Sequence, residues 1–547
     1  MPLSDYDILY DVVVIGGGPA GSTTATMLAK QGYSILLFER SQFPRDHVGE
    51  SLLPASMPVL EELGVLDDIK RSGFLPKWGA TMVWGSNRTP WSWYFNETNH
   101  QYPHSYQVWR PQFDKLLLDN SRTHGVHVLE QHRVMEVLFE ESRAVGVKFS
   151  DEKGEIKTVY AKFVADASGQ QTLLASQLET KQWDDFFQNL AVYGYFSGVS
   201  NLPEPGENNI FIESYENGWI WDIPIHIGWN SIGVVADSSS SQERLQQDGI
   251  SDFLFAEISK SSNVSKMLES AKLESGPFVV KDWSYVCDPM VGDGYILVGD
   301  AACFIDPLFS SGVHLALMSG VLASAFIHTS IKDKSLGAAC ESSYQELYLK
   351  EYRHFRDLAR LFYSSNRSVD SYFWEARRIL ESDSVLSPRN AFIQVVAGQA
   401  VRGYERVVLE HGDLPPSFSH SVKQLETERQ LRQQEFARIG TEIQTEQSYL
   451  KKLHPVLDGE INLVRKPVLG AGEFNWGYFI YSQSRPEGME CSELVAVLVS
   501  KIDGSMALDE LFSIFESMST PDQIGALRSN LIDTIRLLYV DGVITAL

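Results

Sequence analysis

The chain has 547 residues, enough for two to four domains, and a net charge of −25, which argues against nucleic acid and anionic membranes as partners. Acidic residues near the start interrupt any signal peptide, and no apolar run looks long enough to span a bilayer. The four scattered cysteines lack metal or redox spacing, so we expect a cytoplasmic protein with reduced thiols and no metal.

A glycine-rich turn follows the first predicted strand. Residues 12–15 are apolar and β-branched, which is typical of a strand buried on both faces of a parallel sheet. Gly16, Gly18 and Gly21 then form a G-x-G-x-x-G pattern that leads into a predicted helix. The first glycine permits a tight turn, the second lets a pyrophosphate approach, and the third permits close packing of the helix. We expect this turn, including Ala20, to bind a dinucleotide.

A second buried strand over 35–38 ends at Glu39, 18 positions after Gly21. A carboxylate there accepts hydrogen bonds from a ribose 2′-hydroxyl and disfavours a 2′-phosphate. The stretch 40–54 mixes cations, carboxylates and glycine, and in a dinucleotide fold it lies beside the phosphates. A solvated loop is the alternative. The candidate cofactor contacts in this stretch are Arg40, Arg45 and Ser51.

A lysine among apolar residues follows a predicted helix over 55–72. Buried at the start of a strand, Lys77 would have a lowered pKa and act as nucleophile or acid. The residue types alone favour a lysine that reaches solvent. The aromatic residues over 91–109 suit either a sheet core or a pocket. Gln107 and Arg110, before the next predicted helix, are further candidate cofactor contacts.

The middle of the chain reads as a β-rich insertion. Within it Trp219, Trp221 and Ile223 alternate along a predicted strand and therefore share one face, and Pro224 ends that strand or marks an edge. Two indoles at this spacing form a rigid apolar wall, although ordinary sheet packing would place them in the same way.

A turn and an apolar helix come next. A buried strand over 295–298 ends at Gly299 and Asp300, where the carboxylate is placed to accept hydrogen bonds from a polyol. Pro307 stiffens the following turn. Ser311 and Gly312 open the helix, and the free N–H groups and dipole of a helix start suit an anion. The candidate cofactor contacts in this stretch are Gly299, Asp300, Pro307 and Gly312.

The rest of the chain is expected to form two regions. Residues 331–465 look mostly helical, and a near-heptad pattern over 422–453 is interrupted by charges, which favours packing over a coiled coil. The end resembles a winged-helix module, but residues 467–547 carry a net charge of −7, which argues against DNA. Docking on the body, or binding a protein or peptide, is the expected role.

Taken together, the chain resembles flavin-dependent halogenases over about residues 8–330, within the wider group of FAD monooxygenases of the para-hydroxybenzoate hydroxylase-type fold. The glycine turn and residues 299–300 are common to that group, and residues 47–51 give a narrower match. Residues 219–224 match the halogenase motif W-x-W-x-I-P, the most specific feature, and 304–312 looks like the second halogenase signature.

The resemblance implies an α/β (α+β) fold with a discontinuous, Rossmann-like FAD-binding domain. The expected limits are 1–180 and 285–330 for that domain, 181–284 for a β-rich substrate domain that strands near 79–109 join, 331–465 for a helical region and 466–547 for a small winged-helix-like module.

The resemblance also implies a reaction cycle. Reduced FAD, delivered by a separate NAD(P)H-dependent flavin reductase, reacts with O2 to give a C4a-hydroperoxide, and chloride or bromide attacks it to give hypohalous acid. Lys77 matches the family's lysine, which receives this acid and presents electrophilic halogen to an aromatic carbon. Ser311 and Gly312 match the position that holds halide, and Trp219 and Trp221 match a wall that keeps substrate off the flavin.

Phe309 departs from the pattern, because tryptophan halogenases carry a glutamate at the matching position. An activated ring needs less help to lose its proton, so we expect an electron-rich ring, a phenol such as a tyrosine-like group, free or bound to a peptide or carrier protein. A pyrrole or indole halogenase is one alternative. An FAD-dependent aromatic hydroxylase of the same fold and a non-catalytic flavoprotein with a partner-binding module are the others.

Overall fold

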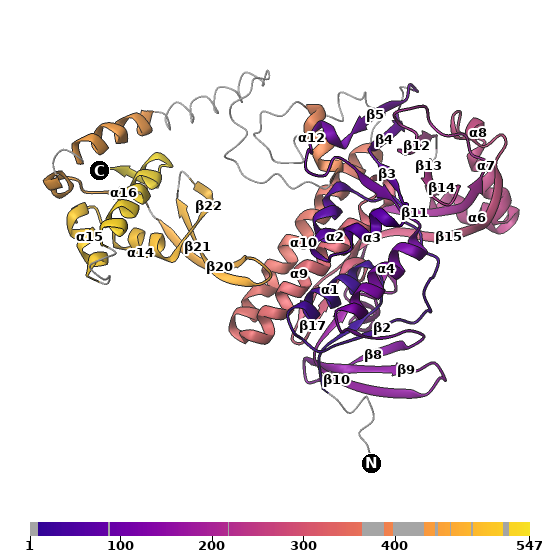
Figure 1. The fold of residues 1–547 in the computed structure, drawn as a ribbon, viewed down its shortest axis with the longest axis horizontal. Helices are drawn as coiled ribbons and strands as arrows, with labels where there is room; N and C mark the ends of the chain where they lie inside the picture. Colours follow the sequence, from indigo (N-terminus) through magenta and orange to yellow (C-terminus); the bar gives the residue numbers. More distant parts are fainter. Residues whose placement is uncertain are drawn as a thin grey trace, which may run out of the picture. The chain divides into compact units, whose positions relative to one another are not determined.

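The computed structural model describes residues 9–85, 88–216, 218–363, 388–397, 431–443, 447–459, 461–482, 485–517 and 524–547. The chain divides into two compact units, 1–410 and 411–547, which are shown in Figure 1. The division falls within the range 331–465 that was predicted as a single helical region.

The first sheet carries the dinucleotide turn. Its strand order is β16-β17-β10-β1-β2-β7, and β17, β10, β1, β2 and β7 run parallel. The strands are β1 (Tyr10–Ile15), β2 (Ile35–Phe38), β7 (His127–Leu129), β10 (Ile156–Asp166), β16 (Val291–Gly292) and β17 (Tyr295–Leu297), and a hairpin of β8 (Arg133–Glu140) and β9 (Arg143–Ser150) extends from β10. The strands predicted over 12–15 and 35–38 are confirmed. The helix predicted after the glycine turn is confirmed as α1 (Pro19–Lys30), and its proline suits the first helical position.

Four helices accompany this sheet. Helix α1 contacts α4 (Arg110–Thr123) and α9 (Gly312–Lys332), and α9 packs along α10 (Lys334–Tyr363), as Figure 1 shows. Among the described residues, α9 has the length and mean hydropathy of a membrane span, which corrects the expectation that no such run exists. Because 78% of that apolar window is buried inside the fold, α9 is a core helix.

The helix predicted over 55–72 is wrong as a single element. The structure has two short helices, α2 (Met57–Glu62) and α3 (Leu66–Arg71), with Gly64 between them at φ +78°. Only glycine adopts that backbone region at no steric cost, so the chain turns there although the apolar periodicity continues.

The second sheet carries the indoles, in the strand order β18-β15-β11-β14-β13-β12-β4-β5. Its strands are β4 (Gly79–Val83), β5 (Trp91–Tyr94), β11 (Lys181–Ser197), β12 (Ile210–Tyr215), β13 (Gly218–Ile225), β14 (Trp229–Asp237), β15 (Lys272–Cys287) and β18 (Cys303–Phe304). Two short strands form a separate pair outside this sheet: β3 (Leu75–Lys77) and β6 (Ser105–Gln107).

The β-rich insertion also contains three helices that were not predicted. These are α6 (Ser238–Asp248), α7 (Ile250–Ile258) and α8 (Val264–Met267). Phe253 and Leu254 of α7 pack against Ile220 and Ile232, on the face of the sheet opposite the indoles. The insertion therefore buries one face under helices and leaves the indole face to the rest of the unit.

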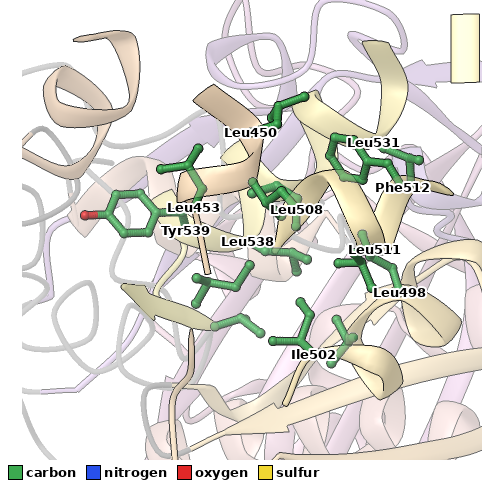
Figure 2. Packing of buried hydrophobic residues seen from close by; sticks show 14 of the residues in the cluster. Leu450, Leu453, Leu498, Ile502, Leu508, Leu511, Phe512, Leu531, Leu538 and Tyr539 are labelled. Atoms are coloured by element: carbon green, nitrogen blue, oxygen red, sulfur yellow. The ribbon is translucent and has the colours of Figure 1, made fainter. Parts of the chain in front are cut away.

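The second unit has its own core, part of which Figure 2 shows. Its helices include α14 (Glu493–Lys501), α15 (Leu508–Glu516) and α16 (Ile524–Val540), and its strands include β19 (Val456–Leu457), β20 (Asn462–Leu469), β21 (Phe474–Ser482), β22 (Arg485–Cys491) and β23 (Ile544–Ala546). A helix over 431–443 contributes Phe436, Ile439 and Ile443 to the same core. Those residues of the near-heptad pattern thus pack into this unit, while 422–430 lie outside the described residues.

Candidate active site

A cavity of about 560 Å³ runs from the glycine turn after β1 to the indoles of β13. Residues predicted from the sequence make up much of its lining: Gly16, Gly18, Ala20, Glu39, Arg40, Arg45, Ser51, Arg110, Trp219, Trp221, Ile223, Asp300, Pro307 and Gly312. Six predicted residues are not in that lining: Gly21, Lys77, Gln107, Pro224, Gly299 and Ser311.

The glycines of the turn are required by close contacts. Gly16 has φ +104°, and a Cβ atom there would lie 2.3 Å from the carbonyl oxygen of Ala167. A Cβ atom on Gly21 would lie 1.9 Å from the carbonyl oxygen of Gly16, so this position serves packing and not contact with a ligand. Gly18 instead leaves room toward the cavity, where the nearest atom to a Cβ would be Arg45 Nη2 at 3.4 Å. A backbone cradle open at one glycine suits a pyrophosphate.

Glu39 is buried at the end of β2 and held by backbone donors. Its Oε2 accepts a hydrogen bond from the Gly17 N–H at 2.9 Å, and Oε1 accepts one from Ser41 at 2.8 Å. Each carboxylate oxygen has a second lone pair, so the group can also accept a hydrogen bond from a hydroxyl of a ligand in the cavity.

The two arginines of the cavity are used differently. Arg110 is buried, with Nε and Nη2 donating to the two oxygens of Asp114 at 2.8 and 2.9 Å and Nη1 donating to the carbonyl of Val48 at 2.5 Å. Arg110 therefore braces the loop at the cavity edge. Arg45 lies with Nη1 3.4 Å from Asp114, and that buried atom makes no hydrogen bond within the described structure. Arg45 thus offers a cation to a phosphate.

Other polar groups at the cavity also fit a dinucleotide such as FAD. Burial raises the pKa of the Asp300 carboxyl to about 7, and this group can accept hydrogen bonds from a polyol. The Ser51 hydroxyl is buried without a hydrogen-bond partner among the described residues. Gln107 pairs with Ser51 through the backbone, and its Nε2 donates to the carbonyl of Asn208. The Glu39 carboxylate, the open cradle at Gly18, the Arg45 guanidinium on the cavity wall and the unpartnered Ser51 hydroxyl together fit the cofactor.

The indole wall is formed by Trp219 and Trp221, both buried, with ring centroids 5.9 Å apart. Ile223 continues the same face, as the alternation predicted, and all three line the cavity. Trp221 Nε1 donates to Ser231 Oγ on β14 at 3.1 Å. Pro224 pairs with Asn230 near the end of β13, beyond the residues that β12 pairs, which suits a residue without an N–H.

The predicted anion turn reaches the cavity through Ser310 and Gly312, whereas Ser311 is buried and does not line it. Ser310 has φ +57°, and Ser311 stands at the N-terminal cap of α9. The first N–H groups of a helix lack partners within the helix, and here the helix begins at the cavity wall. The first turn of α9 therefore borders the cofactor space, and a helix start is a favourable environment for an anion.

Lys77 does not reach solvent, since only 1% of it is exposed. Its Nζ donates to the carbonyl of Leu52 at 2.9 Å and lies 5.5 Å from the centre of the Phe95 ring. Burial lowers the pKa of Lys77 to about 7. Leu52 directly follows Glu50 and Ser51, which line the cavity, so one short segment touches both the cavity and the amine.

Sequence reasoning missed a buried acid in the cavity. Glu50 is fully buried, and its Oε1 accepts a hydrogen bond from the Tyr195 hydroxyl at 2.8 Å. Burial raises the pKa of Glu50, while the hydrogen bond from Tyr195 opposes the rise. Its place in the narrower match at 47–51 was the available signal. By contrast, the aromatic run over 91–109 is not part of the cavity lining, and Trp91 and Trp93 pack against Phe392 of α12 (Pro388–Val396).

Phe309 stands in the turn before α9 and is buried. Its ring meets Phe362 of α10 edge-on, with ring centroids 5.2 Å apart. The position at which tryptophan halogenases carry a glutamate is thus part of an apolar contact between the turn and α10.

Comparison with known proteins identifies the family. The family model described as tryptophan halogenase matches residues 96–413, and a model described as FAD dependent oxidoreductase matches 11–177. The chain is 34% identical to a tryptophan 2-halogenase from Chondromyces crocatus, over 71% of this chain and 75% of the relative. It is 31% identical to a 1H-pyrrole-2-carbonyl-[peptidyl-carrier protein] chlorinase from Pseudomonas fluorescens, over 75% and 93%.

A solved structure gives the same result. The myxobacterial chondrochloren halogenase CndH, described as a variant of FAD-dependent halogenases, aligns with a TM-score of 0.64 at 38% identity. The alignment covers 72% of this chain and 91% of CndH. The cavity, with its cradle for a dinucleotide and its wall of two indoles, therefore belongs to a known class of enzymes: this chain is a member of the flavin-dependent halogenases, which are FAD-dependent oxidoreductases.

Proposed function

We propose that this halogenase modifies an electron-rich aromatic ring, a phenol, and that Lys77 carries the halogen to it. The observation that supports the proposal most is the amine itself, which is enclosed in the fold and has a pKa lowered to about 7. Near neutral pH a large share of such an amine is unprotonated and has a lone pair to donate.

The cofactor is held by the cavity. Arg45, Glu39, the open cradle at Gly18 and the carboxylate of Asp300 would hold FAD, with the indoles of β13 closing the far end. When bound in reduced form, delivered by a separate flavin reductase, FAD supplies hypohalous acid from O2 and chloride or bromide. The start of α9, at Gly312, would hold the halide beside it.

The lysine then carries out a balanced exchange. The Lys77 nitrogen attacks the halogen of hypohalous acid, the halogen–oxygen bond breaks, and water leaves with the proton that nitrogen gives up. The ring carbon attacks the halogen, the nitrogen–halogen bond breaks, and the ring proton is lost, which restores the amine. The carbonyl of Leu52, 2.9 Å from Nζ, orients the amine through its N–H and leaves the lone pair free.

Phe309 favours a substrate with an electron-rich ring. The apolar contact of Phe309 with Phe362 leaves no carboxylate at this position to remove the ring proton, so the ring itself has to be activated. A phenol meets that demand. The relatives named above act on tryptophan and on a pyrrole carried by a peptidyl-carrier protein, so a carrier-bound ring is the second candidate.

The test is product analysis with purified protein, FAD, a flavin reductase, NADH and bromide. Free tyrosine, simple phenols, tryptophan and carrier-loaded tyrosyl and pyrrolyl groups are offered in parallel. A bromine isotope pattern on a phenol is the expected result. Bromination of only indole or pyrrole would overturn the phenol assignment, and a mass gain of one oxygen would show hydroxylation instead.

A further inference from the structure

A chain of hydrogen bonds links the indole wall to the turn before α9. Trp219 Nε1 lies 2.5 Å from the Tyr363 hydroxyl, at the end of α10, and that hydroxyl lies 2.6 Å from Oδ2 of Asp306. Oδ1 of Asp306 accepts the backbone N–H of Leu308 at 3.0 Å. The turn that leads to the predicted halide site and the wall beside it are thus joined through one carboxylate.

The chemistry of the groups fixes the direction of the chain. An indole nitrogen is only a donor, so the Tyr363 oxygen accepts from Trp219 and gives its own proton to Asp306. Asp306 is buried and also accepts from Asn189 Nδ2 at 3.1 Å. Each group has a partner that it loses if a neighbour is changed, and a buried polar group without a partner is costly.

Packing holds the phenol in this place. The Tyr363 ring meets Trp84 and Phe187 with centroids 6.0 and 5.5 Å away, and Trp84 also lies 6.5 Å from Trp219. The Trp84 Nε1 donates to the carbonyl of Phe362, which fixes the end of α10 against β4. Rings on several sides leave Tyr363 few other orientations.

We propose that Asp306 is a positioning residue that sets the indole wall relative to the halide turn. The inference rests on the proposed function, because it gives the wall the task of separating the cofactor space from the ring. With Asp306 in place, Trp219 is fixed to the same turn that opens α9, so wall and halide site move together. Without it, Trp219 turns on its own, and hypohalous acid escapes before it reaches Lys77.

The first experiment observes the hydrogen bond without any reaction. Proton–nitrogen correlation spectra of the deuterated protein give the indole N–H signals, and Trp219→Phe and Trp221→Phe assign those of the wall. We expect the Trp219 signal at the position of a hydrogen-bonded indole, and moved upfield in both Asp306→Asn and Tyr363→Phe. The Trp221 signal, bonded to Ser231, should stay in place in both.

The second experiment measures halogenated product formed per reduced FAD oxidised. Asp306→Asn and Tyr363→Phe should each lower this ratio about tenfold, the effect expected when one partner of a buried charge-assisted hydrogen bond is lost. Two matched controls should change it less than about twofold. Asp222→Asn alters a buried carboxylate of β13 bonded to Asn230, and Tyr344→Phe removes a buried α10 hydroxyl bonded to the Leu297 carbonyl.

The outcomes separate the two proposals. An unmoved Trp219 signal in Asp306→Asn, or an equal loss in the controls, would overturn the role of Asp306. If Asp306→Asn does not fold, Tyr363→Phe, which removes a single oxygen atom, decides in its place. A wild-type protein that halogenates no phenol would refute the proposed function while leaving the hydrogen-bond result standing.

Discussion

The cofactor cavity and the surroundings of Lys77 differ in how far buried charges have partners of opposite charge or hydrogen-bond donors. In the cavity, charges are matched: Arg110 grips Asp114 with two hydrogen bonds, and Glu39 is bound by backbone N–H groups. Lys77, fully buried, donates to the carbonyl of Leu52, and among the described residues no carboxylate offsets the burial that lowers its pKa. Under the proposed function, the matched charges bind a dinucleotide, while the amine, which has no matching charge, is neutral enough to react.

The largest expected effect comes from removing the amine. Lys77→Ala should lower halogenation by about a hundredfold or more, as is usual for the loss of a reacting group, while FAD binding stays intact because Lys77 does not line the cavity. Product formation and flavin fluorescence titration measure the two. The matched control is Lys181→Ala, which removes a β11 lysine placed over the Tyr285 and Trp183 rings. Halogenation that survives in Lys77→Ala would remove the lysine from the mechanism.

The second-largest effect is expected from a substitution that distorts the glycine turn of the cavity without changing Lys77. Gly21→Ala places a Cβ atom 1.9 Å from the Gly16 carbonyl oxygen, so the turn has to shift. We expect a loss of roughly 1–3 kcal/mol in stability and a protein purified with little flavin. Gly440→Ala, in a helix of the other unit with nothing within 4 Å of a Cβ atom, is the control and should be neutral or slightly stabilising. Thermal unfolding and flavin content test this, and full flavin content in Gly21→Ala would contradict it.

The pH dependence sharpens the contrast. Because the ammonium has no lone pair, the halogenation rate should fall about tenfold per unit as pH drops below about 7. In the unfolded chain Lys77 has the ordinary lysine pKa of 10.5, so between about pH 7 and 10.5 the unfolded state binds more protons. The free energy of unfolding should therefore rise with pH across that window, and Lys77→Met should remove the rise. A flat rate between pH 5.5 and 8 (about the range in which His and low-pKa amines titrate) would argue against a neutral amine.

The smallest expected effect lies at the phosphate end of the cavity. Arg45→Ala should weaken FAD binding about tenfold and leave turnover at saturating FAD unchanged, since Arg45 is a cation that lines the cavity with its Nη2 beside the cradle at Gly18. Arg40→Ala is the comparison, because Arg40 Nη1 already donates to Gln171 at 2.8 Å. Equal losses in both variants would mean that general charge, and not a specific contact, attracts the cofactor.

Local patterns were enough to predict the dinucleotide turn and the indole strand. The glycine spacing and the β-branched run placed β1, β2 and Gly21, and the alternation of Trp219, Trp221 and Ile223 predicted a shared face. These features depend on neighbours in the sequence, because period and backbone conformation are local properties. The residue types gave no such help with Lys77. Its burial depends on Phe95 and Leu52, which other elements bring around it.

Longer-range partners escaped prediction for the same physical reason. Glu50 meets Tyr195, and Asp306 meets Tyr363, across 145 and 57 positions of sequence. Nothing in the local pattern marks such pairs. The break at Gly64 was missed because apolar periodicity alone does not show where a turn interrupts it. The helices over 238–267 were missed because the polar stretch 238–248 and the short apolar stretch 250–258 form helices next to a sheet, which a local pattern does not show.

The segment Glu50-Ser51-Leu52 connects the cofactor cavity to Lys77. Its first two residues touch the cofactor space, and the carbonyl of the third grips the amine. Only two peptide bonds separate Glu50 from Leu52, so a shift of the backbone at the cavity also moves the carbonyl that accepts from Lys77. We therefore expect flavin binding and the orientation of the Lys77 amine to be coupled, and substitutions at these three positions to change both.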